Sequence, residues 1–581
     1  MDDVRVLVRG LGPSNKNITV ESYREFFQNE ENITDALSKM ISIEISELML
    51  NCELIPKFLK IISCLKKIKV LKLTGNSNKI ADFLKKNQEK LKFIEDLSIS
   101  SLNSQHFGVL SIFNASCLKS ISIHFDDLAN VIEEYLIFLE SLNTLESLNL
   151  NVSFAPKDHS YDSIKQTLKK MCNLKNLSLN LSKCYETQSY QTILSAFSSM
   201  SKLETINFEY YKPHSGEELI NSLESHTVNN LKKLIIPIES FNFNSKFHNL
   251  MSLEITSSYS FQKNNALIED NDYFIYLKEL IFKKEVGALE TFYLKKFSNL
   301  EKLSLGRKIN FWNYGYFFEC LGQMKKLNDL DLKFSFYNNG GGSPEINMNG
   351  LNNYLIMINA LTSLRISCES YSGNENEPFI IGDFSKLSHL TKLTLELKKM
   401  KVADFQMREH PSLKHFSFNL SSCGMENNIK IIMSSFLTNC KNLETLSLSP
   451  DQEFPLDFLK NLHKLTKLTL RIPKPIEISF PDNLSYLNLY FAFDVTNDHL
   501  KLYISCFCGL KKLKHLVLLF AVENADFFFE ILQEFFNKQK DQTIETLELN
   551  EIYYEPDKIK NFFKNSKGLV KLQLGTNIFF K

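Results

Sequence analysis

Apolar and polar residues alternate in a short pattern that returns along the whole chain. Leu174-x-x-Leu177-x-Leu179 places three apolar residues three and then two positions apart, and Ser178 and Asn180 stand next to them. Period-two alternation predicts a strand with Leu177 and Leu179 on one face and Ser178 and Asn180 on the other. The same pattern lies 29 residues earlier and 29 residues later in the chain.

The pattern recurs 21 times between Ile45 and Leu569, at a mean spacing of about 26 residues. Between its copies the apolar residues change to helical spacing, as at Ile164, Leu168 and Met171. Similar helical stripes are expected over 80–91, 193–197, 429–436 and 528–536. Each unit is therefore expected to be strand, turn, helix, turn. One such unit cannot bury both of its apolar faces, so neighbouring units must stack.

A period of 20 to 30 residues built on L-x-x-L-x-L resembles the leucine-rich repeat family, with arrays of the ribonuclease-inhibitor and F-box types. The resemblance implies an α/β solenoid with parallel strands on a concave face and helices on the convex face. One departure is visible. The family often places Asn or Cys three residues after the last leucine, and here only Asn76 and Asn577 are asparagines at that position. We expect the other turns to satisfy their backbone groups differently.

The chain divides into three parts on this interpretation: an N-terminal cap with a short strand and helices at 1–44, the solenoid at 45–550, and the last repeat with a C-terminal cap at 551–581. Insertions interrupt the array near 337–350 and 369–384. The step from Leu465 to Leu484 is short and contains prolines, so an extended or 3₁₀ connection is expected there. The apolar tail Ile578-Phe579-Phe580 either folds back as the cap or offers an edge to a partner.

Composition narrows the classes of partner and compartment. The chain has 67 basic and 67 acidic residues and a formal net charge of zero, so we expect no nucleic acid partner and no membrane surface. No apolar run approaches the roughly 18 residues of a membrane helix, and the N-terminal residues lead into no signal peptide. Eleven scattered cysteines, among them Cys64, Cys172 and Cys440, are interpreted as buried reduced thiols. They favour an intracellular, cytoplasmic location.

Motifs of enzymatic chemistry are absent from the sequence. It contains no phosphate-binding loop, no His-Glu-x-x-His, no Gly-x-Ser-x-Gly and no kinase signature. The twelve histidines are dispersed, and His415 and His515 occupy outward strand positions where a solvated side chain is expected. We therefore expect no enzyme, no cofactor, no metal site and no small-molecule substrate.

The concave face supplies the candidate binding site. Most of its residues are small, neutral and polar, as Ser178 and Asn180 are, which is typical of a solvated sheet. The C-terminal part differs, because outward positions of two adjacent units carry larger side chains: Tyr486, Tyr490, His515, Val517 and Leu519. Exposed aromatic clusters mark interaction sites, and tyrosines supply hot spots. The competing interpretation is that another segment of this chain covers them.

Function follows from the resemblance as a non-catalytic intracellular scaffold or adaptor that binds a protein partner through the concave face. One alternative is a regulatory subunit of an enzyme, either a GTPase activator or a ubiquitin-ligase substrate adaptor, although residues 1–44 show no F-box. The other is a structural component of a cytoskeletal or ciliary assembly.

Overall fold

The computed structural model describes ten segments of the first half of the chain and eleven of the second, with single residues or pairs missing within some of them. They are 42–46, 69–74, 82–100, 110–125, 132–152, 158–181, 192–210, 230–236, 249–256, 275–283, 297–309, 314–336, 346–370, 378–421, 424–450, 453–507, 509–521, 525–538, 544–549, 561–574 and 577–580. The chain separates into two compact units, Met1–Lys284 and Glu285–Lys581.

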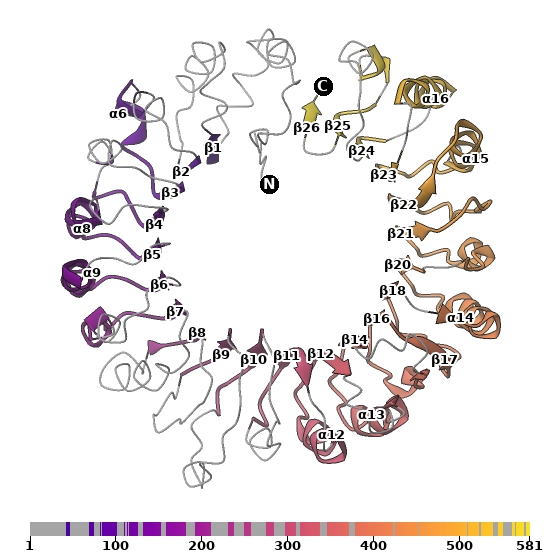
Figure 1. The fold of residues 1–581 in the computed structure, drawn as a ribbon, viewed down its shortest axis with the longest axis horizontal. Coiled ribbons are helices and arrows are strands. Elements are labelled where there is room, and N and C mark those ends of the chain that lie inside the picture. Colours follow the sequence, from indigo (N-terminus) through magenta and orange to yellow (C-terminus); the bar gives the residue numbers. More distant parts are fainter. Residues whose placement is uncertain are drawn as a thin grey trace. The chain divides into compact units, whose positions relative to one another are not determined.

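The first unit contains one strand for each repeat, and these strands pair in parallel in chain order (Figure 1). They are β1 (Ser42–Ser46), β2 (Val70–Thr74), β3 (Asp96–Ser100), β4 (Ser120–Phe125), β5 (Ser147–Val152), β6 (Asn176–Leu181), β7 (Thr205–Tyr210), β8 (Lys233–Ile236), β9 (Ser252–Ile255) and β10 (Glu279–Phe282). Its described helices form a second layer: α6 (Gln88–Leu91), α8 (Ile132–Glu140), α9 (Asp158–Lys170) and the 3₁₀ turn η2 (Phe197–Ser199).

The second unit repeats the same plan. Its parallel strands are β11 (Lys302–Ile309), β12 (Asp329–Phe336), β14 (Ser363–Ser370), β16 (Lys392–Lys398), β18 (His415–Ser421), β20 (Thr445–Ser449), β21 (Lys467–Ile472), β22 (Tyr486–Asp494), β23 (His515–Ala521), β24 (Thr546–Leu549) and β25 (Lys571–Leu574). Behind them lie α12 (Tyr314–Gln323), α13 (Met348–Leu355), η6 (Phe384–Lys386), α14 (Asn427–Asn439), η7 (Asp457–Asn461), α15 (Asn497–Phe507) and α16 (Ala525–Lys538).

A second, smaller parallel sheet begins at the predicted insertions and lies in the same repeats as α13, η6 and α14. It pairs β13 (Ile346–Asn347), β15 (Pro378–Ile381), β17 (Lys401–Phe405) and β19 (Gly424–Met425) in chain order. Residues 337–345 and 371–377, the loop portions of those insertions, lie outside the described residues. The described residues of both insertions, which include β13 and β15, belong to the repeats that carry this small sheet.

The register between neighbouring strands explains how the apolar core forms. Leu148, Leu177 and Ile206 are aligned across three adjacent strands, and each is at most 1% exposed. Burying one such side chain is worth about 1.5–3 kcal/mol relative to leaving it in water. Because the same two inward strand positions are aligned in every repeat, each strand extends one continuous apolar layer. The polar residues between them lie on the opposite face, which we call the open face of the sheet.

Four expectations from the sequence concern the N-terminal part of the first unit. The first copy of the pattern was assigned to Ile45, but Ile43 and Ile45 pair with Leu71 and Leu73, so that copy begins at Met40. This assignment was wrong because 40–50 holds two overlapping apolar series. Residues 1–41 and Cys64 lie outside the described residues, as do Ile80 and Phe83 of the stripe at 80–91, whereas Leu84 and Leu91 of that stripe are buried.

In α14 the buried residues are Ile429, Met433, Phe436 and Leu437, whereas Ile432 is exposed, contrary to expectation. The short step after β21 has no helix, as expected. The tail forms β26 (Asn577–Phe580), which pairs antiparallel with β25 and so folds back on the last repeat.

Asparagines before the strands satisfy turn carbonyls, in place of the family's usual ladder. The Asn173 amide donates to the Asn143 carbonyl at 2.8 Å, and its Oδ1 accepts from Lys202 of the next repeat at 2.7 Å. The same relay recurs in the second unit through Asn442 and Lys464. Further asparagine or lysine members are found at Asn230, Lys326, Asn483 and Lys512. The signal was present in the sequence as repeated Asn-Leu dipeptides.

Buried His410 gives the second unit a pH dependence. The side chain is fully buried, and its Nδ1 lies 3.2 Å from Ser412 Oγ. Burial lowers the pKa of His410, although a hydrogen bond to the Phe384 backbone and the charge of Asp383 act in the opposite direction. The imidazole is therefore neutral in the folded chain at neutral pH.

Stability of the second unit is expected to fall as the pH drops below about 6.5, the pKa of histidine in an unfolded chain. Below that pH the unfolded chain takes up a proton that the folded chain does not. A single histidine can change the free energy of unfolding by at most about 1.4 kcal/mol per pH unit. Urea unfolding of the wild type and of His410→Asn between pH 7.5 and 5.5 measures this change in the free energy of unfolding. The variant should lose less stability on acidification, and parallel pH profiles would contradict this prediction.

Candidate functional site

The structure brings the five predicted site residues together on the open face of β22 and β23. Tyr486 is aligned with His515, and Tyr490 with Leu519. Val517 lies between His515 and Leu519 on β23. We call these five residues the C-terminal patch. Adjacent parallel strands are about 4.8 Å apart, so the five side chains are immediate neighbours.

Exposure differs among the members of the patch. Tyr490 is 46% exposed and His515 is also exposed, whereas Tyr486 and Leu519 are half-buried. Val517 is only 6% exposed, although it occupies an outward position. Its short side chain is aligned with longer ones on both neighbouring strands, Asn488 and Glu548. The accessible part of the patch is therefore mainly aromatic.

Aromatic and cationic contacts hold the patch side chains. The rings of Tyr486 and His515 lie 6.3 Å apart at a tilt of 40°. The guanidinium of Arg471 lies 5.8 Å from the centre of the Tyr490 ring, a cation–π contact. Burial, and then the charge of Glu548, raise the pKa of Tyr486, which keeps its phenol protonated at neutral pH. The patch thus offers hydroxyl groups next to apolar ring faces.

Phe491 and Phe493, on the same strand as the two tyrosines of the patch, belong to the packing beneath it. Phe491 is buried, with its ring 4.8 Å from Tyr503 of α15 and 6.0 Å from Phe520 of β23. Phe493 packs edge-on to Phe491 at 5.8 Å and to His499 at 5.5 Å. These contacts fix β22 and β23 against α15 and so hold the patch in place.

Elsewhere on the open face, polar side chains bind one another between adjacent repeats. Asn149 donates to Ser122 at 3.1 Å, and Asn207 donates to Ser178 at the same distance. In the second unit Arg365 pairs with Glu396 at 2.7 Å. Such contacts agree with the solvated-sheet interpretation for these repeats. His415 is half-buried at its outward position.

A row of charged residues, which the sequence analysis did not identify, runs along one flank of the first unit. It consists of the residue that follows the first apolar residue of each repeat, and we call it the flank row. Over nine consecutive repeats its members are Lys69, Glu95, Lys119, Glu146, Lys175, Glu204, Lys232, Met251 and Lys278. Lysine and glutamate alternate over the first seven. This alternation was visible in the sequence once the repeats were aligned.

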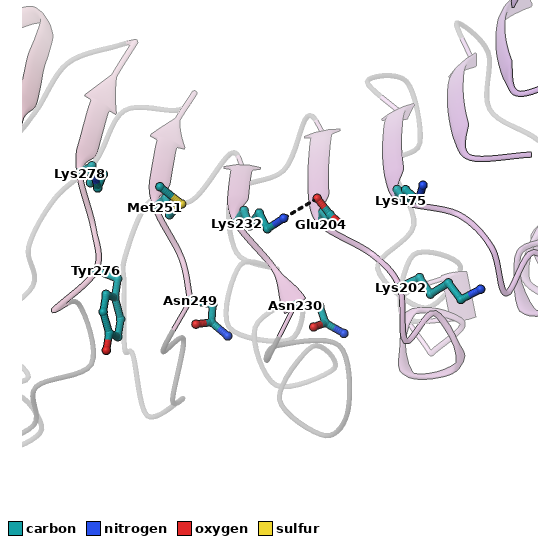
Figure 2. Close-up of a pocket in the computed structure, with 9 residues that line it drawn as sticks. All are labelled: Lys175, Lys202, Glu204, Asn230, Lys232, Asn249, Met251, Tyr276 and Lys278. Carbon is teal, nitrogen blue, oxygen red and sulfur yellow. Dashed lines mark hydrogen bonds and ion pairs between the residues drawn. The ribbon is translucent and has the colours of Figure 1, made fainter.

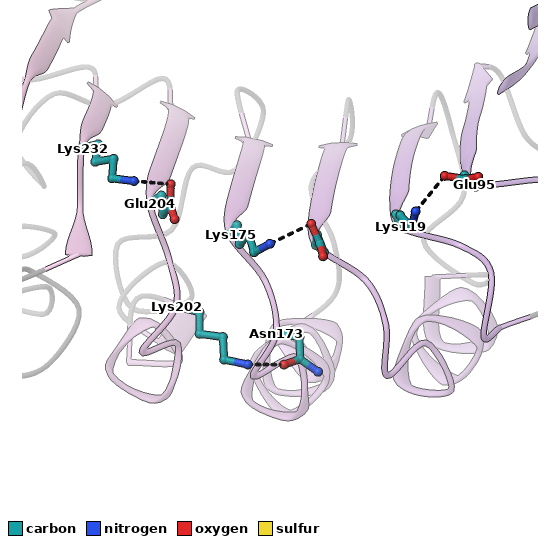
Figure 3. Close-up of polar contacts among 8 residues, drawn as sticks. Glu95, Lys119, Asn173, Lys175, Lys202, Glu204 and Lys232 are labelled. Atoms are coloured by element: carbon teal, nitrogen blue, oxygen red, sulfur yellow. Dashed lines mark hydrogen bonds and ion pairs between the residues drawn. The ribbon is translucent and has the colours of Figure 1, made fainter. Parts of the chain in front are cut away.

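Ion pairs connect the flank row from repeat to repeat (Figure 3). Glu95 accepts from Lys69 at 2.5 Å and from Lys119 at 2.8 Å. Two more pairs follow along the row: Lys175–Glu146 at 3.0 Å and Lys232–Glu204 at 2.8 Å. The hydrogen bonds from Lys119 and Lys69 lower the pKa of Glu95 to about 2. The side chains of these pairs are 26–58% exposed, so each pair contributes little to stability.

Where Met251 interrupts the alternation, the flank is hollowed (Figure 2). A cavity of about 580 Å³ is lined by two rows of residues. The flank-row members are Lys175, Glu204, Lys232, Met251 and Lys278, and the row before the strands contributes Lys202, Asn230, Asn249 and Tyr276. Met251 is 41% exposed and Tyr276 is 59% exposed.

The described residues contain no candidate metal site, and three of their cysteines are buried. No group of three or more His, Cys, Asp or Glu side chains within them could hold a metal ion. Cys320, Cys368 and Cys440 are buried and form no disulfide, and burial raises the pKa of Cys440 to about 12. Cys172 is exposed, contrary to expectation, because it lies in the turn after α9 and outside the apolar pattern. None of the helices described is long and apolar enough to cross a membrane.

Comparisons with known proteins find similar chains among the solved structures. No protein-family model matches the chain, and no curated protein matches it. Among solved structures, the chain is similar to the crystal structure of a TLR13–ssRNA13 complex, with 16% sequence identity and a TM-score of 0.44. The match covers 92% of this chain and 79% of the other.

The repeated, register-aligned L-x-x-L-x-L strands decide the fold. The chain is an α/β leucine-rich repeat solenoid. Among the described residues, the C-terminal patch and the hollow beside Met251 are two places where exposed apolar or aromatic side chains interrupt the repeated polar pattern.

Proposed function

We propose that this leucine-rich repeat solenoid is a non-catalytic scaffold that binds a protein partner through the C-terminal patch. The observation that carries the proposal is the exposed ring of Tyr490, which lies over Arg471 on the open face and beside the other patch residues. Tyrosine and arginine are the residues most often found as hot spots of protein interfaces.

The patch has the composition of an interface centre. Its rings present apolar faces at small cost in side-chain entropy, and its hydroxyl and imidazole groups can form hydrogen bonds with a partner. Lys571 and Glu548, paired at 3.0 Å on the neighbouring strands, provide a polar rim. An apolar centre with a polar rim is the usual anatomy of a protein interface.

Quantitative affinity capture tests this proposal. The full chain and the double variant Tyr486→Ala/Tyr490→Ala are used as bait in an extract of the source cells, and captured proteins are measured by mass spectrometry. We expect at least one protein to be captured by the wild type and to fall at least tenfold with the variant, which corresponds to about 1.4 kcal/mol. The variant Ile431→Ala is the matched control, because Ile431 is exposed on α14, outside the patch.

Equal capture by the patch variant and the wild type, with unchanged melting temperatures, would reject the patch as the binding surface. The identity of a captured protein separates the alternatives: a GTPase, a ubiquitin ligase subunit, or a cytoskeletal or ciliary component. A single-stranded RNA arm is included, because a net charge of zero excludes a global basic field but not a local one. Loss of RNA binding alone in the patch variant would replace the proposed partner class.

A further inference from the structure

The flank row shows how this solenoid holds a carboxylate. Glu95 lies between lysines of the preceding and following repeats and accepts from both. Lys119, in turn, is held by Glu95 and lies near the charge of Glu146, and both raise its pKa. Every second position of this row is therefore a place where a negative group is stabilised by its two lysine neighbours.

One such place holds no carboxylate. The alternation predicts a glutamate between Lys232 and Lys278, but the chain has Met251 there. Lys232 and Lys278 are two repeats apart, as are Lys69 and Lys119, so their separation along the row is about 10 Å. Beneath them Tyr276 and Asn249 line the rest of the hollow (Figure 2).

We propose that this hollow binds an acidic peptide segment of a partner protein. One aspartate or glutamate of the peptide supplies the missing carboxylate between Lys232 and Lys278, and an adjacent apolar side chain packs against Met251 and Tyr276. The peptide lies along the flank, across the repeats. Three residues of an extended peptide span about 10 Å, the separation of the two lysines, so a stretch of this length can place its acidic residue between them.

Charge on the flank favours such a segment. Lys202 lies in the hollow and donates to the neutral amide of Asn173, so that contact does not neutralise its charge. With Lys202, the nine repeats of the flank row carry six lysines and three glutamates, a formal excess of three positive charges. The existing pairs are exposed and individually weak, so a lysine can exchange its partner for a ligand carboxylate at small cost.

A nucleic acid fits this flank less well than a peptide. Its phosphates would follow one another without a break, and they would pass the carboxylates of Glu146 and Glu204, which separate the lysines of the row. Met251 and Tyr276 also give the hollow an apolar floor that calls for an apolar side chain. A short peptide combines both kinds of group.

Peptide selection followed by a single substitution tests the proposal. A displayed library of random ten-residue peptides is selected on the full chain, and affinities of the enriched peptides are measured by fluorescence anisotropy. We expect peptides with an aspartate or glutamate next to an apolar residue. Met251→Glu completes the alternating row from within the chain, so it should fold like the wild type and weaken these peptides at least tenfold. Tyr276→Ala is the second variant and should weaken them as well.

The matched control is Ile137→Glu, which makes the same change of charge at an exposed position of α8. It should leave peptide binding unchanged. The proposal is overturned if no acidic peptide is enriched, if Met251→Glu binds them as the wild type does, or if Ile137→Glu weakens them equally. Competition by single-stranded RNA that Met251→Glu abolishes would assign the hollow to nucleic acid instead. The Tyr486→Ala/Tyr490→Ala variant should retain peptide binding, so this test is independent of the C-terminal patch.

Discussion

Replacing Phe491 by alanine is expected to destabilise the repeats around β22 by about 3–5 kcal/mol. The ring is buried and contacts Tyr503 on α15, Phe520 on β23 and Phe493 on its own strand. Alanine would remove the side chain that joins two strands to the helix layer and leave a cavity that these large rings cannot fill by small movements. This is the largest effect that we expect from a single substitution near the patch.

The loss should be local, because each repeat contacts only its neighbours and repeat stabilities add approximately. Hydrogen exchange measured by mass spectrometry is therefore the suitable assay. Amide protection in Phe491→Ala should fall over β21 to β23 and α15 and remain unchanged in β3 to β6 of the first unit. Phe93→Ala, a change at an exposed ring, is the control and should alter no segment. A uniform loss across both units would contradict local coupling.

Replacing Tyr503 by phenylalanine is expected to cost about 1–3 kcal/mol, although it removes one oxygen atom. Tyr503 is fully buried, and its hydroxyl accepts from the backbone N–H of Ile476 at 3.1 Å. The segment around Ile476 connects β21 to β22 without a helix and contains Pro473 and Pro475. Prolines have no N–H to donate, so this connection depends on the few amides that it has.

Hydrogen exchange over 473–480, together with thermal unfolding, measures this second effect. Protection at Ile476 should be lost in Tyr503→Phe, with smaller changes in the flanking strands. Tyr490→Phe removes the same atom from an exposed ring and should stay within about 0.5 kcal/mol of the wild type. Equal behaviour of the two variants would show that the Tyr503 hydroxyl does not hold the connection.

The fold could be predicted from the sequence because burial selects residues at fixed positions. The pair Leu177 and Leu179 recurs in register across the strands, and only a stack of parallel strands buries such a series. Where two apolar series overlap, as near Ile45, the pattern alone cannot assign the register. The small sheet of β13, β15, β17 and β19 was missed because two- to five-residue strands contain too few residues for a period.

The candidate sites were harder to predict for a different reason. The sequence placed Val517 on the outward face correctly, but its exposure depends on the lengths of Asn488 and Glu548 on neighbouring strands. Likewise, Met251 is ordinary when considered alone, and it becomes informative only when its repeat is aligned with seven others. The repeats can be recognised in one stretch of sequence, but the contacts between repeats can be predicted only when several repeats are compared.

The return of β26 onto β25 has a consequence for assembly. A stack of parallel strands can grow without limit, because the last strand presents free N–H and C=O groups to another copy, and a head-to-tail contact of that kind leads to filaments. An antiparallel strand from the same chain occupies those groups on β25. The four residues Asn577–Phe580 thus cover the edge of β25, and a parallel strand from another copy could pair with β25 only by displacing them.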